Sequence, residues 1–168
     1  ETYRTWSSVD KQNRNRAYNY VWIAYFYFEM YHVTGNKQYL TDGYLTLKSL
    51  YSQFGHGFYA IATPVCLGLR SLKSAGMTEE YESLREDFIK LGDTYVANGL
   101  NYPRHEVNYE QSIVAPALIV LTQLYLETGM QKYLDEAERQ IPILEAFGGF
   151  QPSYHLNDIS IRHWDGYW

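Results

Sequence analysis

Cysteine and positive charge are both scarce in this 168-residue chain. The single cysteine, Cys66, excludes an internal disulfide and matches no metal-ligand spacing, so we expect it to be a packing residue within an apolar segment. Lys and Arg number 14 against 19 Asp and Glu, which gives a formal net charge of -5. Because phosphate binding requires clustered cations, this balance argues against a nucleic-acid partner.

Long hydrophobic runs are also missing. The longest uncharged apolar stretch, 113–126, is too short to span a bilayer and is interrupted by Pro116 and Gln123. The chain begins at Glu1 without a signal-peptide pattern, and it has neither a phosphate-binding glycine loop nor a Ser-His-Asp signature. The sequence therefore predicts no membrane partner and no cofactor, and it indicates no compartment.

Tyrosine, in contrast, is abundant. The chain has 18 Tyr beside 7 Phe and 4 Trp, and its aromatic fraction is 17%. Tyr combines an apolar ring with a polar tip, so the excess suits half-buried surfaces and polar ligands that stack on rings. With 46% hydrophobic and 20% charged residues, the composition is that of a single globular domain with its own core.

Apolar residues recur at helical spacing, whereas the alternation typical of strands is rare. Amphipathic periodicity, with one apolar stripe and one polar face, occupies 40–54, 81–95 and 134–144. Segments that are apolar nearly all round, and so must be covered on more than one side, occupy 17–33, 58–72 and 113–126. Pro64 and Pro116 take matching places in the last two of these segments, which indicates a repeated geometry.

The two kinds of segment alternate, which predicts an all-α domain over 1–168 made of three αα-hairpins in an arc. We expect an entry segment and a tail around the hairpins, with boundaries at 1–16, about 17–54, 58–98 and 110–147, and 148–168. Tight turns at Gly35, Gly76 and Gly129 would close the hairpins at one edge of the arc, which we call the turn edge.

The opposite edge, which we call the loop edge, collects the long connections. It comprises the entry segment together with 55–57, 98–110 and 148–168. Four of the five histidines and three of the four tryptophans lie there, beside several carboxylates. Because long loops on a rigid scaffold commonly carry function, we expect the site at this edge.

Carboxylates beside aromatic rings and hydrogen-bonding side chains are what a sugar site requires. The predicted catalytic residues are Glu106, Glu110, Asp158, Asp165, His105 and His163. The predicted substrate-binding residues are Trp6, His56, Arg104, Tyr109, His155, Arg162 and Trp164. A metal site built from His105, Glu106, His155 and His163 has no recognised spacing, so no metal is predicted.

Each carboxylate also has a structural interpretation. Glu110 would complement the dipole of a helix that begins beside it, and Glu106 would pair with Arg104. Asp158 would cap a turn, and Asp165 precedes Gly166 in a common turn pair. The histidines would then be structural loop residues.

The repeated motif Thr-Gly-x-x-x-Tyr-Leu, at 34–40 and 128–134, resembles the six-hairpin glycosidase superfamily. The tail from Gly149 to Trp168 is similar to the region before a late inner helix in bacterial proteins of that kind. The resemblance implies an (α/α)6 toroid, of which three hairpins make half. The chain would then be a fragment from the C-terminal portion of a larger enzyme. The resemblance supplies no catalytic motif.

Three functions follow as expectations. The first is a carbohydrate-active enzyme that binds an oligo- or polysaccharide and hydrolyses it with the paired carboxylates. The second is a polysaccharide lyase, in which His105 or Tyr109 removes a proton while Arg104 or Arg162 neutralises a uronate carboxylate. The third is a helical-repeat scaffold that binds peptides. Loops confined to one edge favour an enzyme.

The size of the chain carries two further expectations. A half toroid would expose the flanks of its apolar helices, so we expect either an open arc or a homodimer that covers them. A half toroid that lacks one catalytic group would also be inactive alone.

Overall fold

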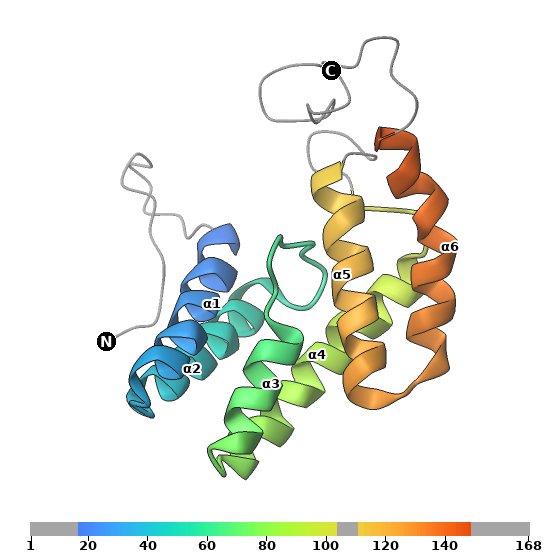
Figure 1. Ribbon diagram of the computed structural model, residues 1–168. Coiled ribbons are helices and arrows are strands. Elements are labelled where there is room, and N and C mark those ends of the chain that lie inside the picture. Colours follow the sequence, from blue (N-terminus) through green and yellow to red (C-terminus); the bar gives the residue numbers. More distant parts are fainter. Residues whose placement is uncertain (1–16, 104–110, 149–168) are drawn as a thin grey trace, which may run out of the picture.

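The computed structural model describes residues 17–103 and 111–148, and within these ranges six helices occur and no strand (Figure 1). Their bounds are α1 Ala17–Thr34, α2 Gln38–Phe54, α3 Val65–Ser74, α4 Thr78–Asn98, α5 Gln111–Thr128 and α6 Gln131–Gly148. Consecutive helices pair as α1 with α2, α3 with α4, and α5 with α6. The predicted all-α arrangement of three hairpins is therefore confirmed.

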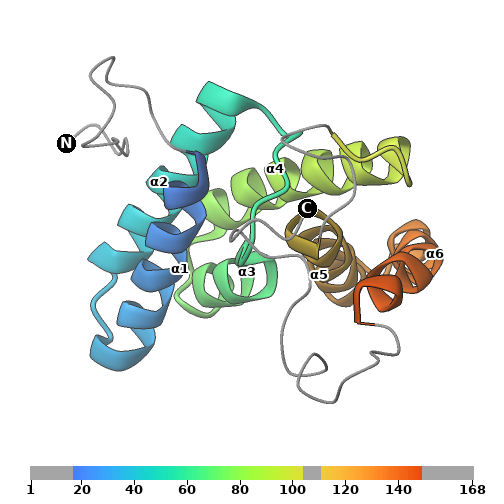
Figure 2. The same ribbon diagram turned by 90° about the horizontal axis from the view of Figure 1, so that it is seen from above.

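The hairpins join side by side. Helix α3 contacts both α1 and α5, and α4 contacts both α2 and α6. In Figure 1, α1, α3 and α5 lie in front, with α2 and α4 behind them, and Figure 2 shows the same rows from above. Among the described residues, no helix is both long enough and apolar enough to cross a membrane.

Glycine lets the helices approach closely around one aromatic ring. Phe28 of α1 is fully buried, and its ring lies 3.1 Å from the position that a Cβ would take at Gly43 of α2 and at Gly68 of α3. Real Cβ contacts are seldom so short, so only glycine leaves this room without displacing the ring. The ring thus joins the first hairpin to the second.

The turn edge is built as predicted. Gly35, Gly76 and Gly129 follow the helices of the front row with φ of 69°, 76° and 68°, in the left-handed region that favours glycine. Their backbone N–H groups donate back to the preceding helix, as in the 2.7 Å bond from Gly35 to the carbonyl of Tyr31.

The second apolar segment differs from its prediction, because α3 begins at Val65 and residues 58–64 form a loop. Pro64 disfavours helix in the residue before it, and its own nitrogen cannot donate to a preceding turn. Pro116, in contrast, lies inside α5. The two prolines therefore occupy different places, and the repeated geometry inferred from them is wrong.

The buried stripe of α6 also differs from the one that helical spacing predicts, namely Leu134, Ala137, Ile141 and Leu144. Ile141 is 42% exposed, whereas Tyr133, Ala137 and Gln140 are buried. Gln140 can be buried because its amide oxygen accepts a 2.8 Å hydrogen bond from Tyr102, and its nitrogen donates to Glu136 at 2.8 Å. A partner from another segment, which periodicity cannot reveal, thus determines the orientation of α6.

Candidate functional site

Several described segments meet at the loop edge. The C-terminal end of α2, the loop 55–64 and the segment 99–103 after α4 lie at the end of the arc opposite the three glycine turns (Figure 1). The predicted division into a turn edge and a loop edge therefore holds over the described residues.

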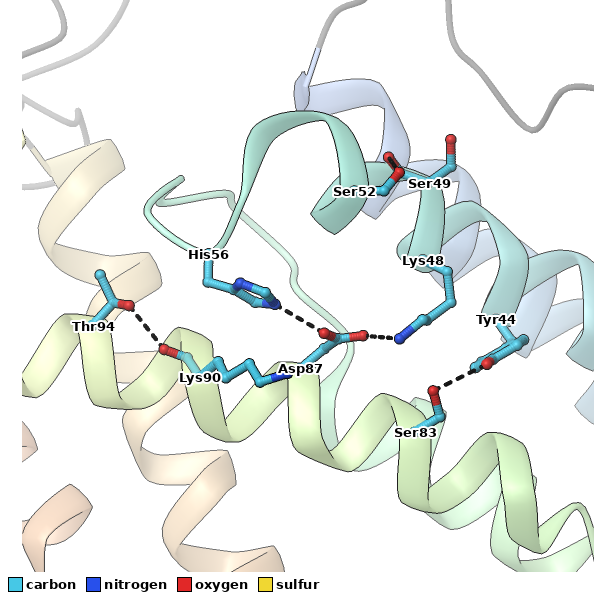
Figure 3. A network of polar contacts seen from close by, with 9 residues as sticks. All are labelled: Tyr44, Lys48, Ser49, Ser52, His56, Ser83, Asp87, Lys90 and Thr94. Atoms are coloured by element: carbon cyan, nitrogen blue, oxygen red, sulfur yellow. Dashed lines mark hydrogen bonds and ion pairs between the residues drawn. The ribbon is translucent and has the colours of Figure 1, made fainter.

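His56 belongs to a polar cluster between α2 and α4, which we call the Asp87 clamp (Figure 3). Its Nε2 lies 2.9 Å from Oδ1 of Asp87, and Lys48 of α2 pairs with the other carboxylate oxygen. The Asp87 side chain is only 8% exposed, whereas those of His56 and Lys48 are 23% and 34% exposed. A nearly buried carboxylate thus has a partner on each oxygen, which compensates the cost of removing it from water.

The ring of Tyr51 stacks on the imidazole of His56. The two rings are parallel within 11°, with centroids 4.8 Å apart. The Tyr51 hydroxyl is buried and has no hydrogen-bond partner among the described residues. Burial, followed by the nearby Asp87 carboxylate, raises the pKa of Tyr51 far above its usual range. The ring therefore stays neutral and holds His56 by stacking.

Two tyrosines fix the loop that follows His56. The rings of Tyr59 and Tyr95 stack with centroids 3.8 Å apart, and the Tyr95 hydroxyl donates to the carbonyl of Phe58 at 2.9 Å. Asn98, at the end of α4, donates to the Tyr59 hydroxyl at 3.3 Å. The first half of the loop 55–64 is therefore held to α4 by polar contacts and by ring stacking.

The segment after α4 is anchored to α6 in the same way. The buried Tyr102 hydroxyl donates to Gln140, which is linked to Glu136, and Glu136 lies 3.2 Å from Arg139. Tyr102 precedes Arg104, a predicted substrate-binding residue, by two positions in the sequence. The anchor thus fixes the chain just before the predicted site residues.

His56 is the one predicted site residue that lies in the described ranges. Its Nε2 is engaged by Asp87, so in this arrangement the ring ties the α2–α3 loop to α4. Its predicted role in binding substrate stays a prediction.

The other predicted site residues lie outside the described ranges. They are the catalytic candidates Glu106, Glu110, Asp158, Asp165, His105 and His163, and the binding candidates Trp6, Arg104, Tyr109, His155, Arg162 and Trp164.

The sequence interpretation overlooked Asp87, Lys48 and Tyr51. A signal was present for Asp87, because this acid adjoins Phe88 of the predicted apolar stripe and so lies at the border of the core. Such a carboxylate needs polar partners from neighbouring elements, and the Lys48 ammonium and the His56 imidazole provide them. Periodicity alone does not identify which residues those partners are.

The described residues define an arc of αα-hairpins with polar joints between neighbouring hairpins. No protein-family model and no curated protein matches the chain. A solved structure, that of the polysaccharide lyase BACCELL_00875, matches over 98% of this chain with 71% sequence identity and a TM-score of 0.91. The chain spans 25% of the length of that protein.

This similarity bears on the expectations from sequence. It supports a relationship to carbohydrate-active proteins, and it favours the lyase alternative over hydrolysis, which was the first expectation. The helical architecture agrees with a toroid of αα-hairpins. The narrower resemblance to six-hairpin glycosidases, the half-toroid and the homodimer stay predictions.

Proposed function

We propose that this chain is the helical part of a polysaccharide lyase that acts on a glycan containing uronate residues. The observation that carries the proposal is the 71% identity to a polysaccharide lyase over 98% of the chain. The fold agrees with it, because stiff hairpins carry long connections at a single edge.

The reaction would be a β-elimination. A base removes the proton alpha to the uronate carboxylate, and the electron pair left behind forms a double bond to the neighbouring ring carbon. The bond from that carbon to the glycosidic oxygen breaks, and the oxygen leaves after taking a proton from an acid. No water is added, so the new non-reducing end is an unsaturated uronate.

The residues assigned to these steps come from the loop edge. His105 or Tyr109 would act as base, because imidazole and phenolate can accept a proton from carbon when held beside it. Arg104 or Arg162 would bind the uronate carboxylate, and a guanidinium suits that group through paired hydrogen bonds. The Tyr102 anchor would hold the chain that leads to Arg104, His105 and Tyr109.

The product distinguishes elimination from hydrolysis. The full-length protein containing this chain is incubated with uronate polysaccharides, and the ultraviolet absorbance of the unsaturated product is followed together with reducing ends. Elimination raises both signals in step. Reducing ends without the absorbance, together with oxygen taken up from labelled water, would contradict the proposal and restore hydrolysis.

Substitutions then test the residues. His105→Ala and Tyr109→Phe test the base and Arg104→Ala tests the carboxylate site, and loss of a group that serves is expected to reduce turnover by a factor of about 100 or more. His32→Gln is the matched control, because His32 lies at the C-terminal end of α1, beside the turn edge, and contacts Ser71 of α3. Full activity in all three loop variants would exclude this assignment.

A further inference from the structure

Aromatic side chains stand exposed along α1. Trp22 and Phe26 are 51% and 55% exposed, and Tyr25 beside them is 42% exposed. Tyr18 precedes Trp22 by four residues, as Trp22 precedes Phe26. Residues four apart lie on one side of a helix, so Tyr18, Trp22 and Phe26 form a single stripe, which we call the α1 ladder.

The α1 ladder begins at the loop edge. The ring centroids of Tyr18 and Trp22 lie 6.4 Å apart, and the Tyr18 ring meets Phe58 of the α2–α3 loop edge-on at 4.8 Å. The buried residues of α1, among them Ala24 and Phe28, occupy its other side. The ladder therefore runs from the loop that carries His56 along a side of the helix that no other described helix covers.

The ladder differs from the surfaces on which helices pack in this protein. Where two hairpins meet, glycine leaves room for a large side chain, as at Gly68 with Phe28 and at Gly92 with Tyr133. The exposed side of α1 carries no glycine, and its only alanines are Ala17 at the first position and the buried Ala24. It presents large rings and none of the glycines that make room for a neighbouring helix elsewhere in the described residues.

Polar groups and charge lie between the rings. Glu29 accepts a hydrogen bond from Tyr25, and this bond, followed by the charge of Glu29, raises the pKa of the tyrosine. Helix α1 contains no Lys or Arg, and Glu29 is its one carboxylate. A surface of this kind offers ring faces and hydroxyl or carboxylate acceptors, and α1 has no Lys or Arg to bind an anionic group.

We propose that the α1 ladder binds neutral sugar residues of the polysaccharide, a proposal that rests on the proposed function. The apolar face of a pyranose stacks on an aromatic ring, and its hydroxyls donate to acceptors such as Glu29. Rings four residues apart are spaced by roughly 6 Å along the helix axis, comparable to one sugar unit of an extended glycan. The substrate is thus a heteropolysaccharide in which neutral residues accompany the uronate that is cleaved.

Affinity electrophoresis of the full-length protein tests this assignment. The gels contain neutral xylan, glucuronoxylan or polygalacturonate, and the wild type is compared with Trp22→Ala, Phe26→Ala and Trp22→Tyr. Loss of one stacked ring is expected to weaken binding to xylan and glucuronoxylan about tenfold, with much of the binding retained in Trp22→Tyr. Val33→Ala is the control, because Val33 is 79% exposed on the same helix but lies near the turn edge.

Four outcomes would overturn the assignment. They are unchanged binding in Trp22→Ala, an equal loss in Val33→Ala, failure of both neutral and mixed polysaccharides to retard the wild type, or dependence on Trp22 for polygalacturonate alone. Acrylamide quenching adds a direct check. The difference in fluorescence between the wild type and Trp22→Phe comes from Trp22, and acrylamide is expected to quench that difference because the ring is exposed. A protected ring would mean that another part of the protein covers the ladder.

The assignment and the proposed function fail in different ways. If Trp22→Ala forms unsaturated product and its polysaccharide binding and KM are unaltered, sugar binding by the ladder is excluded and the lyase activity is not. Ladder-dependent binding of xylan or glucuronoxylan, together with no unsaturated product from any polysaccharide with uronate in its backbone, would exclude the lyase and leave the ladder.

Discussion

Nε2 of His56 lies 2.9 Å from Oδ1 of Asp87, and this contact attaches the connection after the first hairpin to the middle of the second. Lys48 holds the other oxygen of the same carboxylate. The loop edge is therefore positioned by ionic contacts between the helices behind the front row, as well as by the apolar core. Each contact of this kind can be removed by one substitution.

Asp87→Asn is expected to lower the free energy of unfolding by about 1–3 kcal/mol. The change removes the charge of a nearly buried group, leaves Lys48 without its counter-ion and weakens the contact with His56. Urea denaturation followed by circular dichroism measures the effect. Asp93→Asn is the matched control: Asp93 and Lys132 are 47% and 44% exposed, so this ion pair is expected to contribute less than about 1 kcal/mol. An equal loss of unfolding free energy in Asp87→Asn and Asp93→Asn would contradict the idea that burial of the carboxylate makes the Asp87 contacts stronger.

Tyr51→Phe is expected to raise the free energy of unfolding by about 1 kcal/mol, because it removes a buried hydroxyl that has no partner among the described residues. Tyr95→Phe is expected to lower it by a similar amount, because the hydroxyl of Tyr95 donates to Phe58 at 2.9 Å. The two rings are otherwise alike in burial. Changes of opposite sign in the free energy of unfolding, measured by the same denaturation assay, would therefore show that only the Tyr95 hydroxyl has a hydrogen-bond partner. Destabilisation by both substitutions would reveal a partner of Tyr51.

Tyr51 and Tyr95 are also expected to make the stability of the protein fall as pH rises. Burial raises the pKa of Tyr51 and of Tyr95 in the folded state, so both stay protonated when the unfolded chain ionises. Their contribution to stability is complete below about pH 10 and is lost as pH rises above it. Denaturation midpoints measured from pH 8 to pH 11 should therefore fall, and less steeply in Tyr51→Phe.

Much of the fold was predictable because two local signals agree. Helical periodicity located five of the six helices to within a few residues, and the three glycine turns determined where the hairpins close. The start of α3 was missed because Pro64 was interpreted by its place in a repeat, although its effect on the residue before it is local. The orientation of α6 was missed because Gln140 is buried through Tyr102, which lies 38 residues away.

The site was less predictable. The sequence located the loop edge, because chemically rich connections there contrast with short turns opposite. It did not reveal that Asp87 and Lys48 meet His56, since such partners depend on how two hairpins pack. A half toroid was expected to expose flanks of its apolar helices; Trp22 and Phe26 of α1 are exposed, and the half toroid itself stays a prediction.

Gly92→Ala is expected to destabilise the protein by about 1–3 kcal/mol, although alanine favours helix over glycine by up to about 1 kcal/mol. A Cβ at this position would lie 2.9 Å from Cε1 of Tyr133 and closer still to Leu124, and both side chains are fully buried. Gly57→Ala is the control, because a Cβ there meets nothing within 4 Å. A gain in thermal stability in Gly92→Ala would show that the joint between α4 and the third hairpin can expand without cost.

Cys66 is expected to react slowly with iodoacetamide in the native protein. Burial, followed by a hydrogen bond and the charge of Glu127, raises the pKa of its thiol to about 11, while Arg70 acts in the opposite direction. Since the thiolate is the nucleophile, the rate at pH 8 should be roughly a hundredfold below that of the unfolded chain in urea, and the two rates should converge above about pH 11. Glu127→Gln removes the raising charge and leaves Arg70, so the native rate should increase at pH 8. A native rate that already reaches its plateau near pH 9 would contradict the desolvated thiol.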